Sequence, residues 1–212
     1  MIVLFGGEKG GVGKTTLAIN IATLRTSVNN DLLLIDTDKQ ATSSYWCSVR
    51  EEKNICPRIA SVQKYEKSLR NEVVELSKKF SDIIIDAGGR DSVELRCSLL
   101  VANKAIFPLR PSQFDLWTLS RLSSLVESAQ EVNDSLRAFV VVNQASSNPA
   151  VKEAEEMKKF VDDFKNIGLL QTIICERIAF RRAALNGMSV VEYKEDQKSA
   201  AEIKNLYAEI YG

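Results

Sequence analysis

The chain has 212 residues, of which 28 are Lys or Arg and 28 are Asp or Glu, so its formal net charge is zero. It contains no histidine, which excludes a Ser-His-Asp triad, histidine-ligated zinc or haem and an imidazole pH switch. Proton transfer must therefore use a carboxylate, a lysine, a thiol, a tyrosine or water, and the balanced charge argues against a globally basic nucleic-acid binder.

Short apolar runs alternate with longer segments of helical periodicity along the chain. Most of the runs are apolar throughout, as expected for strands covered on both faces. The alternation predicts an α/β fold of three layers, with a mostly parallel, doubly wound sheet and right-handed crossovers. No linker, repeat or low-complexity tract interrupts it, so residues 1–212 are expected to form a single domain. The predicted strands are residues 2–5, 32–35, 82–85, 104–107, 139–142 and 170–174, and the predicted helices are residues 15–27, 41–53, 64–80, 92–102, 112–133 and 150–165.

The cysteines and the N-terminal residues indicate where the protein resides. Four cysteines are scattered without a Cys-x-x-Cys pair, which is typical of reduced thiols. Residues 1–5 lack the features of a signal peptide, and no apolar run approaches the roughly 20 residues that span a bilayer. We therefore expect a cytoplasmic protein.

A glycine-rich segment, residues 6–16, lies between the first predicted strand and the first predicted helix. Glycines allow backbone N–H groups to converge on phosphate oxygens, and the N-terminal end of a helix adds a positive partial charge. Lys14 would reach the β- and γ-phosphates, and the Thr15 hydroxyl would bind Mg²⁺. The segment predicts a site for ATP and Mg²⁺, with nucleotide contacts from Gly10, Gly11, Val12, Gly13, Lys14, Thr15 and Thr16.

This loop departs from the usual P-loop pattern at two adjacent positions, and the departure matches a known variant of the loop. Glu8 stands where G-x-x-x-x-G-K-[ST] requires glycine, and Lys9 precedes the glycine pair. The resulting K-G-G-x-G-K-T-T resembles the deviant Walker A loop of the ParA/MinD superfamily. The resemblance implies that Lys9 reaches across a dimer interface to the phosphates of the other subunit's nucleotide, where a second cation stabilises transition-state charge.

Two aspartates follow the second predicted strand, at the sheet edge where ligands of parallel α/β folds bind. Residues 36–40 resemble the superfamily's D-x-D-P-Q segment, with Lys39 in place of proline. The resemblance implies that Asp38 orients the attacking water or accepts its proton, and that Asp36 supports the metal. A site without histidine would have to use such a carboxylate. The alternative is that both aspartates merely cap the helix predicted at residues 41–53.

A third acidic residue, Asp86, follows the predicted strand at residues 82–85. A carboxylate after an apolar strand fits a Walker B aspartate, which holds Mg²⁺ through a water. Many members of the superfamily carry two prolines after this strand, whereas Gly88 and Gly89 stand here. Two glycines suit a loop that moves with the γ-phosphate.

Two further segments resemble the superfamily in the second half of the chain. The strand predicted at residues 139–142 would end near the base, which implies that Asn143 reads the adenine amino edge; the alternative is an ordinary turn residue. Residues 108–115 resemble the superfamily's proline-bearing segment at the dimer face, and we predict no chemistry there.

A basic stretch follows the last predicted strand. Arg177, Arg181 and Arg182 give residues 177–191 a charge of +3 with no acidic residue. In the superfamily, basic residues near this place bind DNA without sequence preference, through salt-sensitive phosphate contacts. Dimerisation would double the patch, so that a neutral chain could bind DNA only in its ATP-bound form. The alternative is a solvated basic turn.

The resemblance as a whole implies an ATPase of the ParA partition type for plasmids or chromosomes. Mg²⁺-ATP would drive formation of a homodimer on nucleoid DNA, and a ParB-like partner would stimulate slow hydrolysis and release.

A second hypothesis is a MinD-like ATPase recruited to membranes, which requires an amphipathic helix. Residues 200–211 place apolar side chains on one face, but their polar side is neutral to slightly acidic, unlike a basic interfacial anchor. We expect that face to pack against the domain, and we expect no membrane binding.

Two more classes of protein share the P-loop. A nitrogenase-reductase type bridges its dimer with an iron–sulfur cluster and needs two suitably placed cysteines per subunit. Here Cys97 falls within a predicted helix and no cysteine lies in the loop after Asp115, which disfavours that class. A related small-molecule ligase would need its own substrate pocket, which spacing alone does not exclude.

Overall fold

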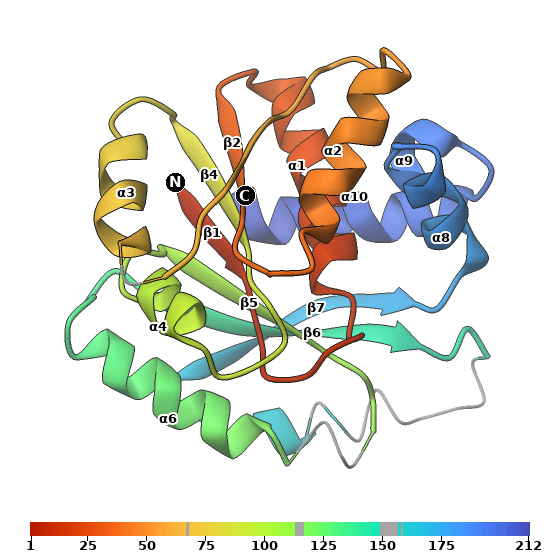
Figure 1. The fold of residues 1–212 in the computed structure, drawn as a ribbon. Coiled ribbons are helices and arrows are strands. Elements are labelled where there is room, and N and C mark those ends of the chain that lie inside the picture. Colours follow the sequence, from red (N-terminus) through yellow and green to blue (C-terminus); the bar gives the residue numbers. More distant parts are fainter. Residues whose placement is uncertain (67, 113–116, 149–156, 158) are drawn as a thin grey trace.

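Among the residues that the structure describes, seven strands form one sheet in the order β3-β2-β4-β1-β5-β6-β7, and every pairing in it is parallel. The computed structural model describes residues 1–66, 68–112, 117–148, 157 and 159–212. The sheet confirms the predicted α/β fold with a parallel, doubly wound sheet (Figure 1). Its strands are β1 (Ile2–Phe5), β2 (Leu32–Asp36), β3 (Ala60–Gln63), β4 (Asp82–Asp86), β5 (Lys104–Leu109), β6 (Arg137–Ala145) and β7 (Ile167–Cys175).

Helices cover both faces of the sheet and complete the three layers (Figure 1). One hydrophobic cluster joins the sheet to α3, α4 and α6, and the other joins it to α1, α2, α8, α9 and α10. The helices are α1 (Lys14–Val28), α2 (Thr42–Glu52), α3 (Leu69–Leu76), α4 (Val93–Leu99), α6 (Leu119–Gln130), α8 (Ile178–Leu185), α9 (Val190–Tyr193) and α10 (Gln197–Tyr211).

The central strands show why the apolar runs predicted this fold. Successive side chains of β1 point to opposite faces, so Leu4 packs in one cluster while Val3 and Phe5 pack in the other. Because both faces are covered, all three side chains are completely buried. A strand in this position needs apolar residues throughout, which is the pattern that the sequence carries.

The predicted strands missed one edge of the sheet, and the predicted bounds of some helices differ from the observed ones. The sequence predicts no strand at β3, because three of its four residues are exposed and it carries no continuous apolar run. The helix predicted at residues 64–80 begins only at Leu69, since the Lys64 amide still donates to the Asp36 carbonyl and so extends the β2–β3 pairing. Of the helix predicted at residues 112–133, residues 113–116 lie outside the described residues, and α6 covers Leu119–Gln130. Half of the helix predicted at residues 150–165, namely residues 150–156 and 158, lies outside the described residues.

The strand order determines where a ligand could bind. β1 lies between β4 and β5, so the chain winds away from β1 in both directions. At such a switch point, the loops that leave the carboxyl ends of neighbouring strands diverge and leave a crevice. The glycine-rich loop leaves the carboxyl end of β1, which places it at this crevice.

Candidate functional site

The glycine-rich loop connects β1 directly to α1 and has a backbone that only glycine adopts easily. Gly11 and Gly13 have φ angles of 74° and 93°, in the left-handed region. A Cβ atom on Gly13 would lie 2.2 Å from Nδ2 of Asn143. Gly13 is also the N-cap of α1 and supplies no side-chain cap, so the first N–H groups of the helix face the loop. This arrangement suits the binding of an anion.

Lys14 places an ammonium group inside this loop. Its side chain is 6% exposed, and its Nζ donates a hydrogen bond of 2.6 Å to the carbonyl oxygen of Lys9. Burial lowers the pKa of Lys14, although the negative charges of Asp86 and Asp38 act in the opposite direction. The structure therefore brings Lys14, Asp38 and Asp86 together, as the sequence predicted.

Asp86 is a buried carboxylate at the end of β4. Among the residues that the structure describes, neither of its oxygens has a hydrogen-bond partner. Burial raises the pKa of Asp86 to about 7. The hydroxyls of Thr15 and Ser43 lie close enough to oppose this shift without forming a hydrogen bond of normal geometry, and the charge of Lys14 also opposes it. A buried carboxylate without such hydrogen bonds is costly unless a cation neutralises it. Oxygen ligands suit Mg²⁺, so Asp86 and the Thr15 hydroxyl fit the predicted metal site.

Asp36 pairs with Asp86 across β2 and β4, but its contacts are different. Its Oδ1 accepts from the Asp38 amide at 3.0 Å, and its Oδ2 accepts from the Ser44 amide at 2.9 Å. Because Ser44 lies in the first turn of α2, Asp36 accepts from one of the first amides of that helix, which is a contact that the capping alternative also expects. The part of Asp36 in metal binding stays a prediction.

The loop after β4 packs against both Asp38 and the glycine-rich loop. A Cβ atom on Gly88 would lie 3.3 Å from the Asp38 carboxyl group, and one on Gly89 would lie 2.7 Å from the Gly10 amide nitrogen. Glycine at these two positions therefore permits a close approach of the two loops. Asp38 itself is half-buried, and its Oδ1 accepts from the Gln40 amide at 2.9 Å.

Asn143 lies at the site but makes a contact that the sequence did not predict. It is 3% exposed at the end of β6, and its Nδ2 donates to the carbonyl oxygen of Val12 at 2.7 Å. The donor group therefore faces the glycine-rich loop. The recognition of adenine by Asn143 stays a prediction.

Two further side chains contact this loop, and sequence reasoning missed both. Arg110 follows β5 and donates through Nη2 to the carbonyl oxygen of Gly11 at 2.7 Å. Gln144 donates to the same oxygen through Nε2 at 3.2 Å and accepts from Nε of Arg110. The only available signal was their position at the carboxyl ends of predicted strands.

A cavity of about 290 Å³ opens beside the glycine-rich loop. It adjoins Gly13 and Thr16, so a nucleoside whose phosphates occupy the loop could extend into it. Its walls come from the ends of β6 and β7 and from α8. Its lining residues are Gly13, Thr16, Arg110, Asn143, Gln144, Cys175, Glu176, Arg177, Phe180, Arg181 and Ala184.

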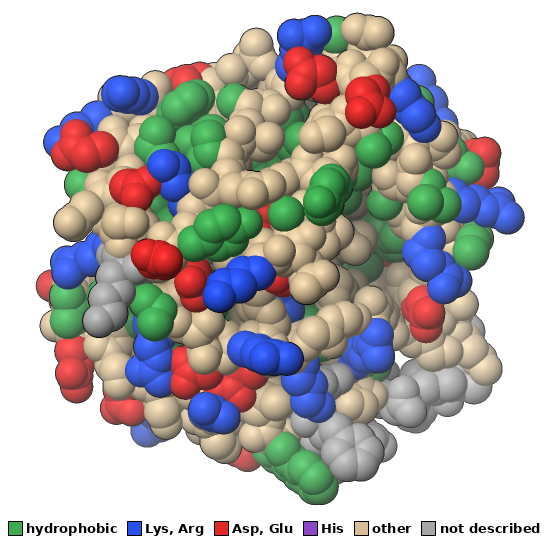
Figure 2. All heavy atoms as spheres, viewed as in Figure 1, with side chains coloured by type: hydrophobic (Ala, Val, Ile, Leu, Met, Phe, Trp, Pro, Cys, Tyr) green, Lys and Arg blue, Asp and Glu red, His purple; other side chains and the backbone are tan. Residues whose placement is uncertain are grey.

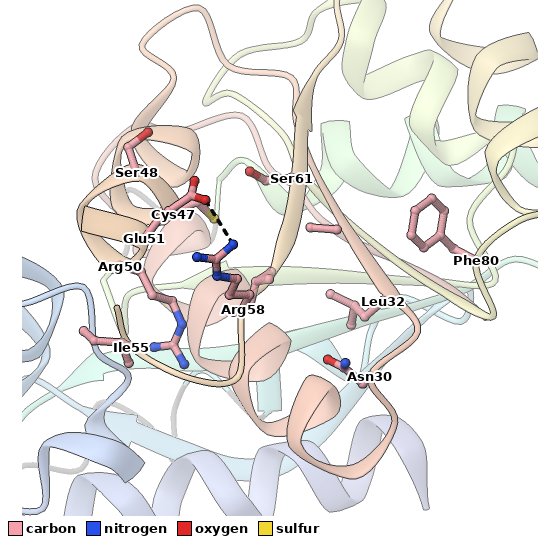
Figure 3. Close-up of a pocket in the computed structure, with 12 residues that line it drawn as sticks. Asn30, Leu32, Cys47, Ser48, Arg50, Glu51, Ile55, Arg58, Ser61 and Phe80 are labelled. Atoms are coloured by element: carbon pink, nitrogen blue, oxygen red, sulfur yellow. Dashed lines mark ion pairs between the residues drawn. The ribbon is translucent and has the colours of Figure 1, made fainter. Parts of the chain in front are cut away.

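A second cavity, of about 450 Å³, lies between α2 and the β3 edge, and no residue of the glycine-rich loop lines it (Figure 3). Its charged groups have partners. Arg58 pairs with Glu51 at 3.5 Å, and Arg50 extends to Glu192 with Nη–Oε distances of 2.9 and 2.6 Å. Burial raises the pKa of the Cys47 thiol at its wall.

The three predicted DNA-binding arginines do not form one free patch. Arg177 is mostly buried and pairs with Glu202 at 2.7 Å, and Arg182 lies 3.7 Å from Glu195. Arg181 is exposed on α8. The charge of +3 counted along residues 177–191 is therefore reduced by acidic residues that follow in the sequence. Basic and acidic side chains are also interspersed on the face in Figure 2.

A comparison with known protein families matches residues 3–190 to the CobQ/CobB/MinD/ParA nucleotide binding domain. The chain belongs to this family. Known ATPases are among the family's members, and the predicted ParA/MinD resemblance is confirmed.

Individual relatives match this chain over nearly their whole length. The maintenance of carboxysome distribution protein A of Halothiobacillus neapolitanus is 26% identical over 205 residues, which cover 95% of this chain and 92% of that protein. The chromosome-partitioning ATPase Soj of Treponema pallidum is 22% identical, with 98% and 96% covered. The structure of apo McdA from Cyanthece superposes with a TM-score of 0.80 at 14% identity, over 100% of this chain and 99% of that one, and so shares the fold.

The last helix of this ParA/MinD-family chain packs as the sequence predicted. Ile203, Leu206 and Ile210 of α10 are completely buried in the cluster that contains α1. This apolar face therefore contacts the domain. Within the described ranges, no helix is long and apolar enough to span a membrane.

Proposed function

We propose that this chain is a ParA-type ATPase that acts in plasmid or chromosome partition. In this proposal, Mg²⁺-ATP drives formation of a homodimer, the dimer binds DNA without sequence preference, and a ParB-like partner stimulates slow hydrolysis. The observation that carries the proposal is the convergence of Lys14, Asp38 and the unsatisfied carboxylate Asp86 on a loop with left-handed glycines. These groups are the parts that phosphoryl transfer to water requires.

In the proposed hydrolysis reaction, different residues of the chain have different roles. Amide groups of residues 10–16 and the Lys14 ammonium would bind the phosphates. Mg²⁺, when bound, would neutralise charge on the β- and γ-phosphates, and Thr15 and Asp86 would hold it. Asp38 would orient the attacking water and accept its proton. Lys9 would act on the nucleotide of the other subunit, so the dimer would be the competent form.

The DNA-binding part of the proposal rests on α8. Arg181 and Arg182 lie on this helix, and Arg181 also lines the cavity beside Thr16. Two copies of the helix in a dimer would present four such arginines to one duplex. Contacts to phosphates release counterions, so this binding should weaken steeply with salt. Arg177 would act indirectly, since its guanidinium pairs with Glu202.

A second candidate function has one observation in its favour. The relative from Halothiobacillus neapolitanus is named for the maintenance of carboxysome distribution, which suggests a role in positioning a protein cargo. The same ATP-dependent switch would serve that role with a different partner. The MinD-like alternative is less favoured, because the apolar face of α10 is buried.

Retention on DNA with and without nucleotide tests the proposal. Purified protein is passed over immobilised non-specific DNA with Mg²⁺-ATP, with Mg²⁺-ADP and without nucleotide, at several salt concentrations. We expect retention with ATP alone and a flatter salt dependence for the double variant Arg181→Ala, Arg182→Ala. Arg58→Ala, which removes an exposed arginine near β3, is the matched control.

Three outcomes would count against parts of the proposal. Equal retention with and without ATP would remove the nucleotide switch. Co-sedimentation with anionic vesicles in ATP, without retention on DNA, would favour the membrane-recruited alternative. An unchanged salt slope in the arginine variant would move the DNA surface away from α8.

A further inference from the structure

Three side chains from the ends of β5 and β6 contact the carbonyl oxygens of the glycine-rich loop. Arg110 and Gln144 both donate to the carbonyl oxygen of Gly11, at 2.7 and 3.2 Å. Asn143 donates to the carbonyl oxygen of Val12 at 2.7 Å. The guanidinium of Arg110 also donates to Oε1 of Gln144, which joins the two side chains. We call Arg110, Asn143 and Gln144 the carbonyl clamp.

The geometry of the peptide bond gives these contacts a consequence. In a planar trans peptide, the carbonyl oxygen of one residue and the N–H of the next point in opposite directions. A clamp on the carbonyl of Gly11 therefore directs the amide of Val12 away from β5 and β6. In the same way, the bond to the Val12 carbonyl directs the amide of Gly13.

The fit between the clamp and the loop is tight. Asn143 is buried, and its Nδ2 occupies the space next to Gly13 in which a Cβ atom would be only 2.2 Å away. Gln144 has a φ angle of 55°, a left-handed conformation that is unfavourable for a residue with a Cβ atom. Strain of this kind persists where surrounding contacts fix the residue, and it is concentrated at functional sites.

We propose that Arg110, Asn143 and Gln144 are positioning residues that hold the amides of Val12 and Gly13 in the orientation that binds phosphate. This inference rests on the proposed nucleotide binding and deepens it. It assigns Asn143 to the phosphate end of the nucleotide. It also assigns to Arg110 and Gln144 the role of holding the Gly11 carbonyl, which no residue of the loop motif and none of the acidic residues performs.

The proposal differs from base recognition in a measurable way. A residue that reads adenine changes the ratio of the affinities for ATP and GTP, because the two nucleotides differ only in the base. A residue that positions phosphate-binding amides lowers both affinities by the same factor. It also lowers the affinity for inorganic tripolyphosphate, which has no base.

The experiment measures these three affinities by competition against a fluorescent ATP analogue. Arg110→Met keeps the side-chain stem and removes both donors. We expect it to weaken ATP, GTP and tripolyphosphate about tenfold each, as expected for the loss of one or two hydrogen bonds. Arg110→Lys keeps the charge and one donor, so its loss should be smaller. Asn143→Ala should likewise leave the ATP to GTP ratio unchanged.

A matched control separates the clamp from general effects of removing an arginine. Arg137 begins β6, at the opposite end of the strand from Asn143, and its Nη1 also donates to backbone carbonyls, those of Asp134 and Leu136. Arg137→Met should change none of the three affinities. Thermal denaturation of each variant checks folding. Since Arg110 is exposed, Arg110→Met should fold even if Asn143→Ala does not.

The possible outcomes are distinct. Loss of ATP affinity with unchanged tripolyphosphate affinity would overturn the proposal in favour of base recognition. Unchanged affinities for all three ligands in folded Arg110→Met would also overturn it. If the wild-type protein binds neither nucleotide nor tripolyphosphate, the proposed function fails rather than the clamp.

Discussion

The two flanks of the glycine-rich loop are built from different chemistry. On one side, the ends of β2 and β4 carry Asp36, Asp38 and Asp86, which we call the acidic flank. On the other side, the ends of β5 and β6 carry the carbonyl clamp. In the clamp, the donor groups are satisfied by the loop itself. In the acidic flank, Asp86 is buried and has no donor among the described residues.

This difference separates the groups that act on a ligand from the groups that shape its site. A buried polar group without a partner is costly, and a bound ligand can supply the partner. A polar group that is satisfied within the chain is suited to hold a conformation. By this criterion we expect Asp86 to act on the ligand and Asn143 to shape the loop.

The largest effect is expected at Lys14, which lies between the flanks and contacts the loop directly. Lys14→Ala removes a buried ammonium from the loop, so ATP affinity should fall about a hundredfold or more. Equilibrium binding measures it, with Lys53→Ala, an exposed lysine at the C-terminal end of α2, as the control. Unimpaired binding would show that neither flank surrounds the phosphate site.

A large effect on turnover alone is expected at Asp38. Asp38→Ala should bind ATP and form dimers, yet hydrolyse ATP about a hundredfold or more slowly, because a positioned base contributes roughly 10²–10⁴-fold. Single-turnover hydrolysis measures this, with the exposed Asp134→Ala as the control. Normal turnover in Asp38→Ala would remove Asp38 from the mechanism and leave the acidic flank with only a metal site.

A pH-dependent effect is expected at Asp86, whose pKa is raised to about 7 by burial. Mg²⁺ binds the ionised carboxylate, so the Mg²⁺-dependent gain in ATP affinity should weaken as the pH falls below about 7, by up to about tenfold per pH unit. Asp86→Asn should abolish this pH dependence. A gain that is constant from about pH 5.5 to about pH 8 would show that the carboxylate does not bind the metal.

The stability of the nucleotide-free protein should depend on the same group with the opposite sign. Since the pKa in the folded state is raised, the folded protein binds more protons than the unfolded chain between about pH 4 and pH 7. Its stability should therefore fall as the pH rises through this range, and Asp86→Asn should raise the melting temperature at about pH 8. A lower melting temperature for this variant would mean that the carboxylate has a partner inside the protein.

The smallest effect is expected in the carbonyl clamp and concerns stability. Gln144→Gly and Gln144→Ala both remove the side-chain hydrogen bonds, but only glycine relieves the left-handed backbone at φ 55°. The glycine variant should be more stable than the alanine variant by about 1 kcal/mol in denaturant titrations. Equal stabilities would indicate that the backbone relaxes when the clamp is lost.

Sequence reasoning succeeded where burial leaves a pattern in residue type. β1, β2 and β4 are covered on both faces, so their apolar runs located them to within one residue, and the acidic residues at their ends followed. The edge strand β3 has no such pattern. The glycines together with Lys14 and Thr15, placed between a predicted strand and a predicted helix, sufficed to identify the loop.

The rest depended on contacts between distant segments. The partner of Asn143 is a backbone carbonyl 131 positions away, and backbone carbonyls carry no residue-type signal. Arg177 was counted as free charge because its partner, Glu202, lies 25 positions further along the chain. Arg110 was assigned no chemistry for the same reason. Such pairings become visible only when the strand order is known.

The hydrogen bond from Lys14 to the carbonyl of Lys9 uses one of the three N–H donors of the ammonium group. The two remaining donors are available to phosphate oxygens of the proposed nucleotide, so the loop carbonyl fixes the direction of the side chain without using all of its donors. The same hydrogen bond gives the buried ammonium group a partner when no nucleotide is bound. The conformation of the loop is therefore stabilised before a ligand binds.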